Sequence, residues 1–99
     1  MAVKIDVPSK ELADFCRRNR IRRLALFGSV LRDDFTPDSD VDVLVEFEAG
    51  QTPGLAFFAL QRELSGILGR KADLNTVGDL SPYIRQEVID EAEVLYVKT

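Results

Sequence analysis

The chain has no histidine, and it has one cysteine among its 99 residues. Without histidine, it cannot form zinc sites of the Cys/His type or use a histidine as a general base. The single cysteine, Cys16, excludes a disulfide within the chain and fits a reducing compartment. Any bound metal must therefore be held by carboxylates, whose hard oxygens favour Mg²⁺, Mn²⁺ or Ca²⁺.

Long apolar runs are also absent. No segment is long enough to span a membrane, and the N-terminal stretch MAVKIDVPSK lacks the apolar core of a secretion signal. We therefore expect a cytoplasmic protein. Because 99 residues can bury one core, we expect a single domain over residues 1–99.

The sequence has no excess of positive charge. Its net charge is −4, which argues against direct nucleic-acid binding through bulk charge attraction. A run of arginines nevertheless stands out, and it comprises Arg17, Arg18, Arg20, Arg22 and Arg23. The simpler interpretation is a solvated helix end, where cations suit the helix dipole. The alternative is a docking patch for an acidic partner or RNA.

Helical and strand patterns alternate along the chain, which predicts an α/β or α+β domain. We expect three helices, the first of them capped by Ser9. Thr52-Pro53 and Ser81-Pro82 each offer a cap followed by proline at the first helical position of the other two. The first should end near Asn19 or Arg20, and the second near Leu68. Strands are expected over residues 21–27, 41–47, 71–76 and 94–97. The residues expected to face the core from the helices are Leu12, Phe15, Cys16, Phe57, Leu60, Leu64, Ile67, Ile84, Val88 and Ala92.

Two acidic residues, Asp40 and Asp42, open the clearest strand pattern, VDVLVEF. Strand side chains alternate faces, so both carboxylates should project to one side while the valines of the strand face the core. Two carboxylates placed in this way repel each other unless a positive charge lies between them. The pattern therefore indicates a site for a divalent cation.

Gly28-Ser29 follows directly after the strand expected over residues 21–27, and ten residues separate it from Asp40. Glycine allows the backbone to approach a ligand closely, and the turn that follows offers N–H groups to an anion. The serine hydroxyl adds a further donor. These features indicate a phosphate-binding turn opposite the acidic strand.

A third carboxylate, Asp73, lies in the middle of the KADLNT strand. Alternation places Lys71, Asp73 and Asn75 on one face of that strand. If this strand neighbours VDVLVEF, Asp73 completes a cluster of three carboxylates. Two metal ions on three carboxylates can catalyse in-line phosphoryl or nucleotidyl transfer.

Gly28-Ser29 with Asp40-x-Asp42 resembles the motif of the DNA polymerase beta-like nucleotidyltransferases. The short chain with FGSVLRDDFTPDSDVDVLV is similar to the minimal nucleotidyltransferases (MNT), the MntA-like antitoxins that are paired with HEPN toxins. The resemblance continues through ILGRKADLNTV to SPYIRQEVIDEAEVLY. It implies a nucleotidyltransferase fold, with a small mixed β-sheet packed against helices.

The resemblance also implies a metal site. Asp40 and Asp42 would bind two Mg²⁺ ions. Asp73 matches the third carboxylate of the family, which binds the catalytic metal and helps to deprotonate the nucleophile.

For the nucleotide, the resemblance implies that Ser29 contacts the triphosphate of ATP and that Gly28 permits the close approach. Arg32 matches an arginine that is usual after Gly-Ser, and it would touch phosphate or brace the loop. One departure is that this chain reads Leu31-Arg32-Asp33 where relatives often have Ala-Arg-Gly, which could alter the loop.

By resemblance, the chain would transfer AMP from ATP to a tyrosine of a HEPN toxin and act as its antitoxin. One alternative is a binding module that neutralises the toxin by contact, without catalysis. Another is an enzyme that modifies a small-molecule alcohol; this would need a homo-oligomer or a further domain to build the acceptor pocket.

Each candidate residue also has a simpler interpretation. Asp40 and Asp42 could be acids at a loop exit and a strand edge without a ligand, although acids beside an apolar strand demand a partner. Asp73 could be a surface residue of an edge strand, and Arg32 could form a surface salt bridge. The remaining loop acids are expected to be solvated or to cap the turn; they are Asp33, Asp34 and Asp38.

Overall fold

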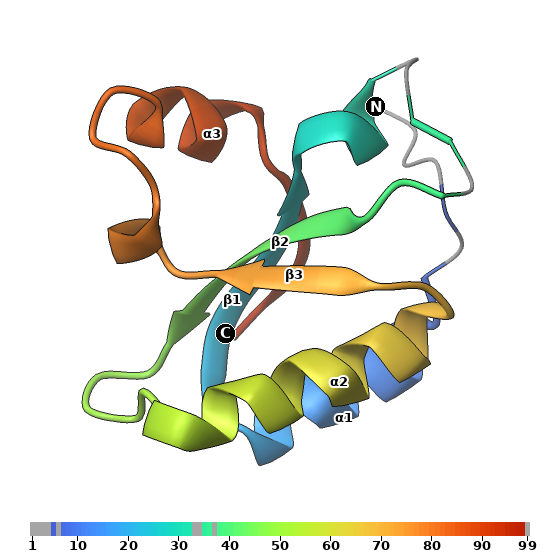
Figure 1. Cartoon of the computed structure of the whole chain (residues 1–99). Helices are drawn as coiled ribbons and strands as arrows, with labels where there is room; N and C mark the ends of the chain where they lie inside the picture. The colour runs from blue at the N-terminus through green and yellow to red at the C-terminus, as the bar shows by residue number, and fades with distance from the viewer. Residues whose placement is uncertain (1–4, 6, 33–34, 37, 99) are drawn as a thin grey trace.

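The computed structural model describes residues 5, 7–32, 35–36 and 38–98, so that Asp33 and Asp34 lie outside the described residues. Helices and strands follow one another in the order α1 (Ser9–Arg18), β1 (Ile21–Phe27), β2 (Val41–Phe47), α2 (Phe57–Leu68), β3 (Ala72–Asn75), α3 (Arg85–Glu91) and β4 (Glu93–Val97) (Figure 1). Three short 3-10 turns join them: η1 (Gly28–Leu31), η2 (Gly54–Ala56) and η3 (Val77–Asp79).

The strands form one four-stranded sheet in the order β3-β2-β1-β4. Strand β1 pairs with β2 and with β4 in antiparallel fashion, whereas β2 and β3 are parallel. The parallel pair is joined by α2, as a crossover between parallel strands requires. The prediction of a small mixed sheet in an α+β domain is therefore confirmed.

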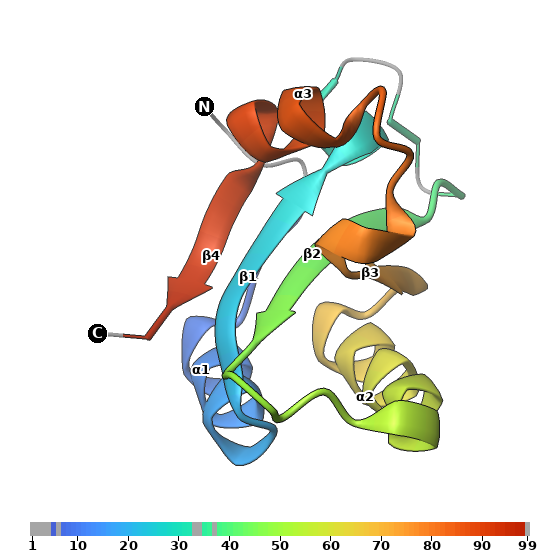
Figure 2. The ribbon, with the colours of Figure 1, turned by 90° about the vertical axis from the view of Figure 1, so that its left-hand side faces the viewer.

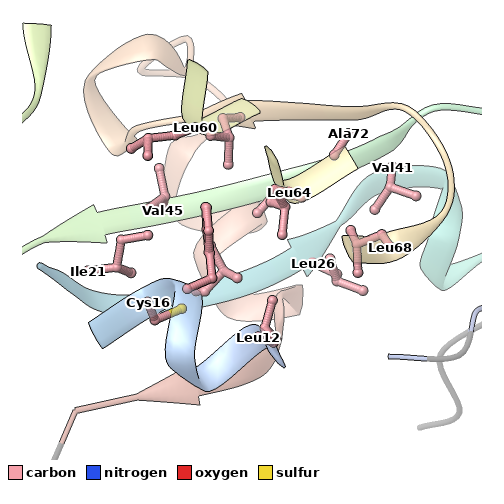
Figure 3. Close-up of a cluster of buried hydrophobic side chains, with 14 of the residues drawn as sticks. Leu12, Cys16, Ile21, Leu26, Val41, Val45, Leu60, Leu64, Leu68 and Ala72 are labelled. Atoms are coloured by element: carbon pink, nitrogen blue, oxygen red, sulfur yellow. The ribbon is translucent and has the colours of Figure 1, made fainter. Parts of the chain in front are cut away.

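Helices α1 and α2 lie next to each other against the same face of the sheet, while α3 lies near the end of β1 that leads into η1 (Figures 1 and 2). The main core fills the space between the two helices and the sheet, and Figure 3 shows its side chains. Leu12, Phe15 and Cys16 of α1 are buried there, as their spacing predicts. From α2 the buried residues are Leu60, Leu64 and Leu68, while Phe57 and Ile67 are partly buried against them.

Strand β2 shows which side chains the sequence places on each face of the sheet. Val41, Val43 and Val45 are buried on the helix side, as the alternation predicts. On the opposite face, Leu44 is also buried and is the register partner of Ala25 in β1. That second face is therefore apolar in the middle of the sheet, and it becomes acidic toward the start of β2.

The starts of the helices differ from the prediction. Helix α1 begins at Ser9 itself, after Pro8 as N-cap, and no side-chain cap hydrogen bond forms. Residues 54–56 form η2 instead of the first turn of α2, which begins at Phe57. Both prolines expected at first helical positions instead precede the helices, because a short turn follows each of them.

Helix α3 differs most from the prediction. It begins at Arg85, after Ile84 as N-cap, and none of its residues is buried. Ile84 is 46% exposed, so the expected inner stripe of Ile84, Val88 and Ala92 does not enter the main core. The predicted C-terminal ends of the first two helices are confirmed. Helix α1 ends before Asn19, and Gly69 ends α2 with a φ of 72°.

Two expectations from composition can be compared with the described residues. Among these residues, no helix combines the length and apolar character that crossing a membrane requires. The thiol of Cys16 is buried, and this burial raises its pKa to about 12. The thiol therefore stays protonated and packs as an apolar side chain.

Candidate active site

The predicted carboxylates Asp42 and Asp73 lie beside each other in the sheet. They are register partners in the parallel pair of β2 and β3, so their side chains project from the same face. Their neighbours Val41 and Ala72 are also partners, and both are completely buried on the helix side. The predicted convergence of the two strands is confirmed, and Asp73 lies on the same side as Asp42.

Gly28 lies directly over the carboxylate of Asp42. Its φ of 77° is in the left-handed region, and a Cβ built on it would clash with Asp42 Oδ2. Glycine is therefore required here for its backbone conformation and for the space that it leaves. Ser29 is the next residue of η1, and its carbonyl accepts a hydrogen bond from the Arg32 N–H at 2.9 Å. The Gly-Ser turn and the acidic strand thus face each other, as predicted.

Negative charge accumulates around Asp42. Burial raises the pKa of this carboxyl above its ordinary value, and the nearby charges of Asp73 and Asp40 raise it further. The guanidinium of Arg32 acts in the opposite direction and lowers the pKa. Arg32 is therefore close enough to influence the site electrostatically, although its side chain is exposed.

Asp40 has a different neighbour. It lies one residue before β2, and its Oδ2 is 3.6 Å from the Nζ of Lys71, which lies one residue before β3. Strand alternation placed Lys71 on the face of Asp73 but assigned it no role. Its position two residues before an acidic site residue was the available signal.

The three carboxylates fit a hard divalent cation in chemical type, and the accumulated charge at Asp42 favours one. Their arrangement fits less completely. Across residues 5, 7–32, 35–36 and 38–98, no group of three or more acidic, cysteine or histidine residues is placed to hold a metal ion. Asp42 and Asp73 are already neighbours, so a site with three ligands requires Asp40 to turn from Lys71 toward them.

Two side chains of α2 fix the backbone on either side of Asp73. The Gln61 Oε1 accepts a hydrogen bond from the Leu74 N–H at 2.9 Å, and the Ser65 Oγ accepts one from the Ala72 N–H at 2.9 Å. Ser65 Oγ also donates to the Gln61 carbonyl at 2.9 Å. These bonds satisfy the outer edge of β3, which lies at the end of the sheet. No sequence pattern signals this contact, because both residues look like ordinary polar positions of a helix.

Comparison with known proteins identifies the chain. Residues 9–95 match the family described as the nucleotidyltransferase domain, and this range contains every candidate site residue. The chain belongs to that family. Its Gly-Ser turn, its paired acids just before and within β2, and its third acid on β3 are accordingly parts of a nucleotidyltransferase domain.

Among known proteins, relatives of this chain include protein adenylyltransferases. This nucleotidyltransferase domain is 38% identical over 89 residues to the protein adenylyltransferase MntA of Thermococcus cleftensis, covering 89% of this chain and 83% of the relative. It is also 37% identical over 94 residues to MJ0128 of Methanocaldococcus jannaschii, a protein classed with the protein adenylyltransferases, covering 93% of this chain and 92% of the relative.

Solved structures agree with the fold. A structure described as a minimal nucleotidyltransferase has a TM-score of 0.70 and 37% identity, with 85% of each chain covered. A toxin–antitoxin structure with AMP-PNP has a TM-score of 0.73 at 22% identity, covering 94% of this chain and 76% of the other. At that identity, the second similarity supports the fold alone. The resemblance that the sequence motif indicated is confirmed.

Helix α3 borders the candidate site, which the sequence did not predict. A hollow of about 170 Å³ lies between the Gly-Ser turn and α3, and its lining includes Gly28, Arg32, Glu87 and Glu91. Since α3 is not buried in the main core, its acidic side chains are available at the border of the site. Ile84 and Val88 also line this hollow, although the sequence predicted that both face the core.

The arginine run of this nucleotidyltransferase forms ion pairs within the chain. Arg18 pairs with Glu63 at 2.6 Å, and Arg17 pairs with Asp14. Arg22 and Arg23 both pair with Glu46. Arg17 and Arg18 lie in the last turn of α1, which agrees with the simpler interpretation of a solvated helix end. Arg22 and Arg23 lie in β1, so that interpretation does not extend to them.

Proposed function

We propose that this chain is a protein adenylyltransferase that transfers AMP from ATP to a hydroxyl of a partner protein. The acceptor is a tyrosine of a HEPN-type toxin, and the chain acts in the cytoplasm as its antitoxin. Two similarities support the proposal. The relative MntA is a protein adenylyltransferase, and a neighbour with a TM-score of 0.64 at 22% identity is an MNT antitoxin in complex with a tri-AMPylated HEPN toxin from Shewanella oneidensis.

The single observation that carries the catalytic part of the proposal is the contact between Gly28 and the Asp42 carboxylate. Only a residue without a side chain lets the backbone of the turn come this close to the carboxylate. A phosphate group bound by the N–H groups of the turn would therefore lie beside cations bound by the strand. Asp73, the register partner of Asp42, extends the same acidic surface.

In this proposal each residue has a distinct role in the transfer. Asp40, Asp42 and Asp73 would hold two Mg²⁺ ions, which would supply positive charge for the triphosphate and for the attacking oxygen. The acceptor oxygen forms a bond to the α-phosphorus of ATP, and the bond from that phosphorus to the β-phosphate oxygen breaks, releasing pyrophosphate. Asp73 takes the proton of the acceptor hydroxyl.

Two further residues orient the nucleotide. Ser29 donates its hydroxyl to a phosphate oxygen from the first turn of η1. Arg32, which already influences the charge of Asp42, neutralises phosphate on the side of α3. Removing either group should weaken ATP binding more than it alters the fold, because neither residue belongs to the main core.

The proposal is tested by incubating the chain with a co-expressed HEPN partner, labelled ATP and Mg²⁺. We expect labelled partner with the wild-type chain and none with Asp40→Asn or Asp42→Asn. Asp38→Asn is a matched control, since Asp38 is an exposed loop acid, and it should label normally. Full labelling by both site variants would contradict the catalytic assignment, and transfer of a different nucleotide would contradict the choice of ATP.

A second candidate function, neutralisation by contact alone, is favoured by one observation. Asp40 is paired with Lys71, and the described part of the chain has no ready cluster of three metal ligands. The Asp42→Asn variant separates the two functions. If it still binds the partner but no longer protects cells from it, the chain acts as an enzyme; if it still protects, contact is sufficient.

A further inference from the structure

Lys71 brings an ammonium group to the entrance of the acidic site. Its Nζ is 3.6 Å from Asp40 Oδ2, and both side chains are accessible to solvent. A backbone hydrogen bond holds Lys71 beside the start of β2, because the N–H of Val41, the residue after Asp40, donates to the Lys71 carbonyl at 2.9 Å. Lys71 also shares a strand face with Asp73, two residues further on. The lysine therefore lies beside the carboxylates and not on a remote surface.

This ion pair gives Asp40 a positively charged neighbour at the edge of the acidic site. Asp42 and Asp73 are neighbours across β2 and β3, whereas Asp40 is drawn to the lysine. Because the pair is exposed and its two atoms are beyond ordinary hydrogen-bond distance, it contributes little free energy. Asp40 can therefore exchange the ammonium for another cation at low cost.

We propose that Lys71 is a positioning residue that competes with a divalent cation for Asp40. When the cation binds, Asp40 turns toward Asp42 and Asp73, and the released ammonium binds a phosphate oxygen of the nucleotide. The long, flexible stem of lysine permits both positions. The inference rests on the proposed function, since it assigns Lys71 to the same nucleotide site.

The first arm of the test measures binding of Mg²⁺ alone, from the rise in melting temperature at constant ionic strength. Removing the competing charge by Lys71→Met should lower the Mg²⁺ midpoint by about twofold to fivefold, the range that an exposed ion pair allows. Lys71→Arg keeps the charge and should stay near the wild-type midpoint. A purely structural role of Lys71 would shift the melting temperature equally at every Mg²⁺ concentration.

Lys98→Met is the matched control for this measurement. Lys98 is also an exposed lysine in an ion pair, with its Nζ 3.2 Å from Glu48 Oε2. That pair lies after the far end of β2, away from Asp40. Lys98→Met should leave the Mg²⁺ midpoint unchanged.

The second arm measures binding of a non-hydrolysable ATP analogue at saturating Mg²⁺ by calorimetry. Lys71→Met should weaken this binding by about tenfold, as expected for the loss of a hydrogen bond between charged groups. The exchange predicts two effects of opposite direction in Lys71→Met: tighter binding of Mg²⁺ and weaker binding of the nucleotide analogue. An unchanged Mg²⁺ midpoint or an unchanged analogue affinity in Lys71→Met overturns the inference.

Failure of this inference can be told apart from failure of the proposed function. If the wild-type chain labels its partner while Lys71→Met binds both ligands normally, only the role of Lys71 is wrong. If both binding shifts appear but no partner is labelled, the exchange at Asp40 stands and the proposed transfer is wrong.

Discussion

The two faces of the sheet have opposite properties, although the same strands supply both. The face under α1 and α2 is apolar from Val41 to Val45, and its side chains are almost completely buried. The other face is apolar in its middle, at Ala25 and Leu44, and it carries partly exposed acids at the start of β2 and in β3. One face therefore supplies stability, and the other collects negative charge that Lys71 and Arg32 only partly offset.

This difference teaches how a small domain can fix an acidic site. Asp42 lies between Val41 and Val43, which are both 0% exposed. Burial of the valines positions the strand, so the repelling carboxylates cannot separate by moving the backbone. The comparison predicts that changes in the helix-side core alter stability, while replacement of the acids on the other face alters function with small or even favourable effects on stability.

Leu64→Ala should produce the largest effect. Leu64 is 0% exposed at the centre of the core, so the free energy of unfolding should fall by about 2–5 kcal/mol. Leu55, which is 89% exposed, is the matched control, and Leu55→Ala should change stability by less than about 0.5 kcal/mol. Chemical denaturation measures both. Similar losses in the two variants would contradict the assignment of the core.

Gly28→Ala should have the next largest effect, and it acts on the acidic face. The new Cβ would meet Asp42 Oδ2 and would also carry an unfavourable positive φ. We expect a loss of about 2–3 kcal/mol in stability together with loss of nucleotide binding. Gly50 has a φ of 74° but nothing within 4 Å of an added Cβ, so Gly50→Ala should cost only about 1 kcal/mol. Equal losses would show that Asp42 does not depend on the space above it.

Gln61→Met should have an intermediate effect on stability. The substitution is in α2, on the helix side of the sheet, but it should also affect the acidic side. Without the Gln61 Oε1, the Leu74 N–H loses its acceptor, which should cost about 1–2 kcal/mol. Because Leu74 adjoins Asp73, labelling of the partner should also fall, although Gln61 touches no substrate in the proposed function. Gln86→Met removes only an exposed bond to Asp90 and should change stability by less than about 0.5 kcal/mol. Normal labelling by Gln61→Met would show that this hydrogen bond has no role in the site.

The bonds from α2 to β3 also mark how far the sequence could predict this site. Alternation in β2 predicted which residues face the core, and the pairing of β2 with β3 confirmed the expected position of Asp73. These features follow from strand periodicity, which a sequence shows directly. The partners of Gln61, Ser65 and Lys71 depend instead on how α2 and the strand ends meet in space, and no local pattern encodes them.

Helix starts were the least predictable part of the fold for a related reason. A capping residue followed by proline occurs at Thr52-Pro53 and Ser81-Pro82, but it permits a turn as readily as a helix. The chain forms η2 after the first proline and an irregular turn after the second. The choice between a turn and a helix therefore depends on tertiary packing. In α3, the expected apolar stripe of Ile84, Val88 and Ala92 lies outside the main core.

Asp42→Asn should have the smallest effect on stability, and its sign distinguishes the two faces. Burial and the charges of Asp73 and Asp40 raise the pKa of Asp42, so its ionised form opposes folding at neutral pH. Replacing it with a neutral isostere should therefore stabilise the fold, by on the order of 0.5 kcal/mol after allowance for solvent screening. The melting temperature should rise by about 2–4 °C while labelling is lost. Asp38→Asn, in the exposed loop, should change neither quantity.

The pH dependence of this difference tests its electrostatic cause. Because the folded-state pKa of Asp42 is raised above its unfolded value, the penalty is fully present above the folded pKa and decreases as the pH falls through it. It vanishes below the unfolded pKa of about 4, where both states bind the proton. Melting temperatures of the wild-type chain and Asp42→Asn should therefore converge as the solution is acidified from neutral pH. A constant difference across this range would show that the substitution acts through packing and not through charge, and the acidic face would then not be strained by its own carboxylates.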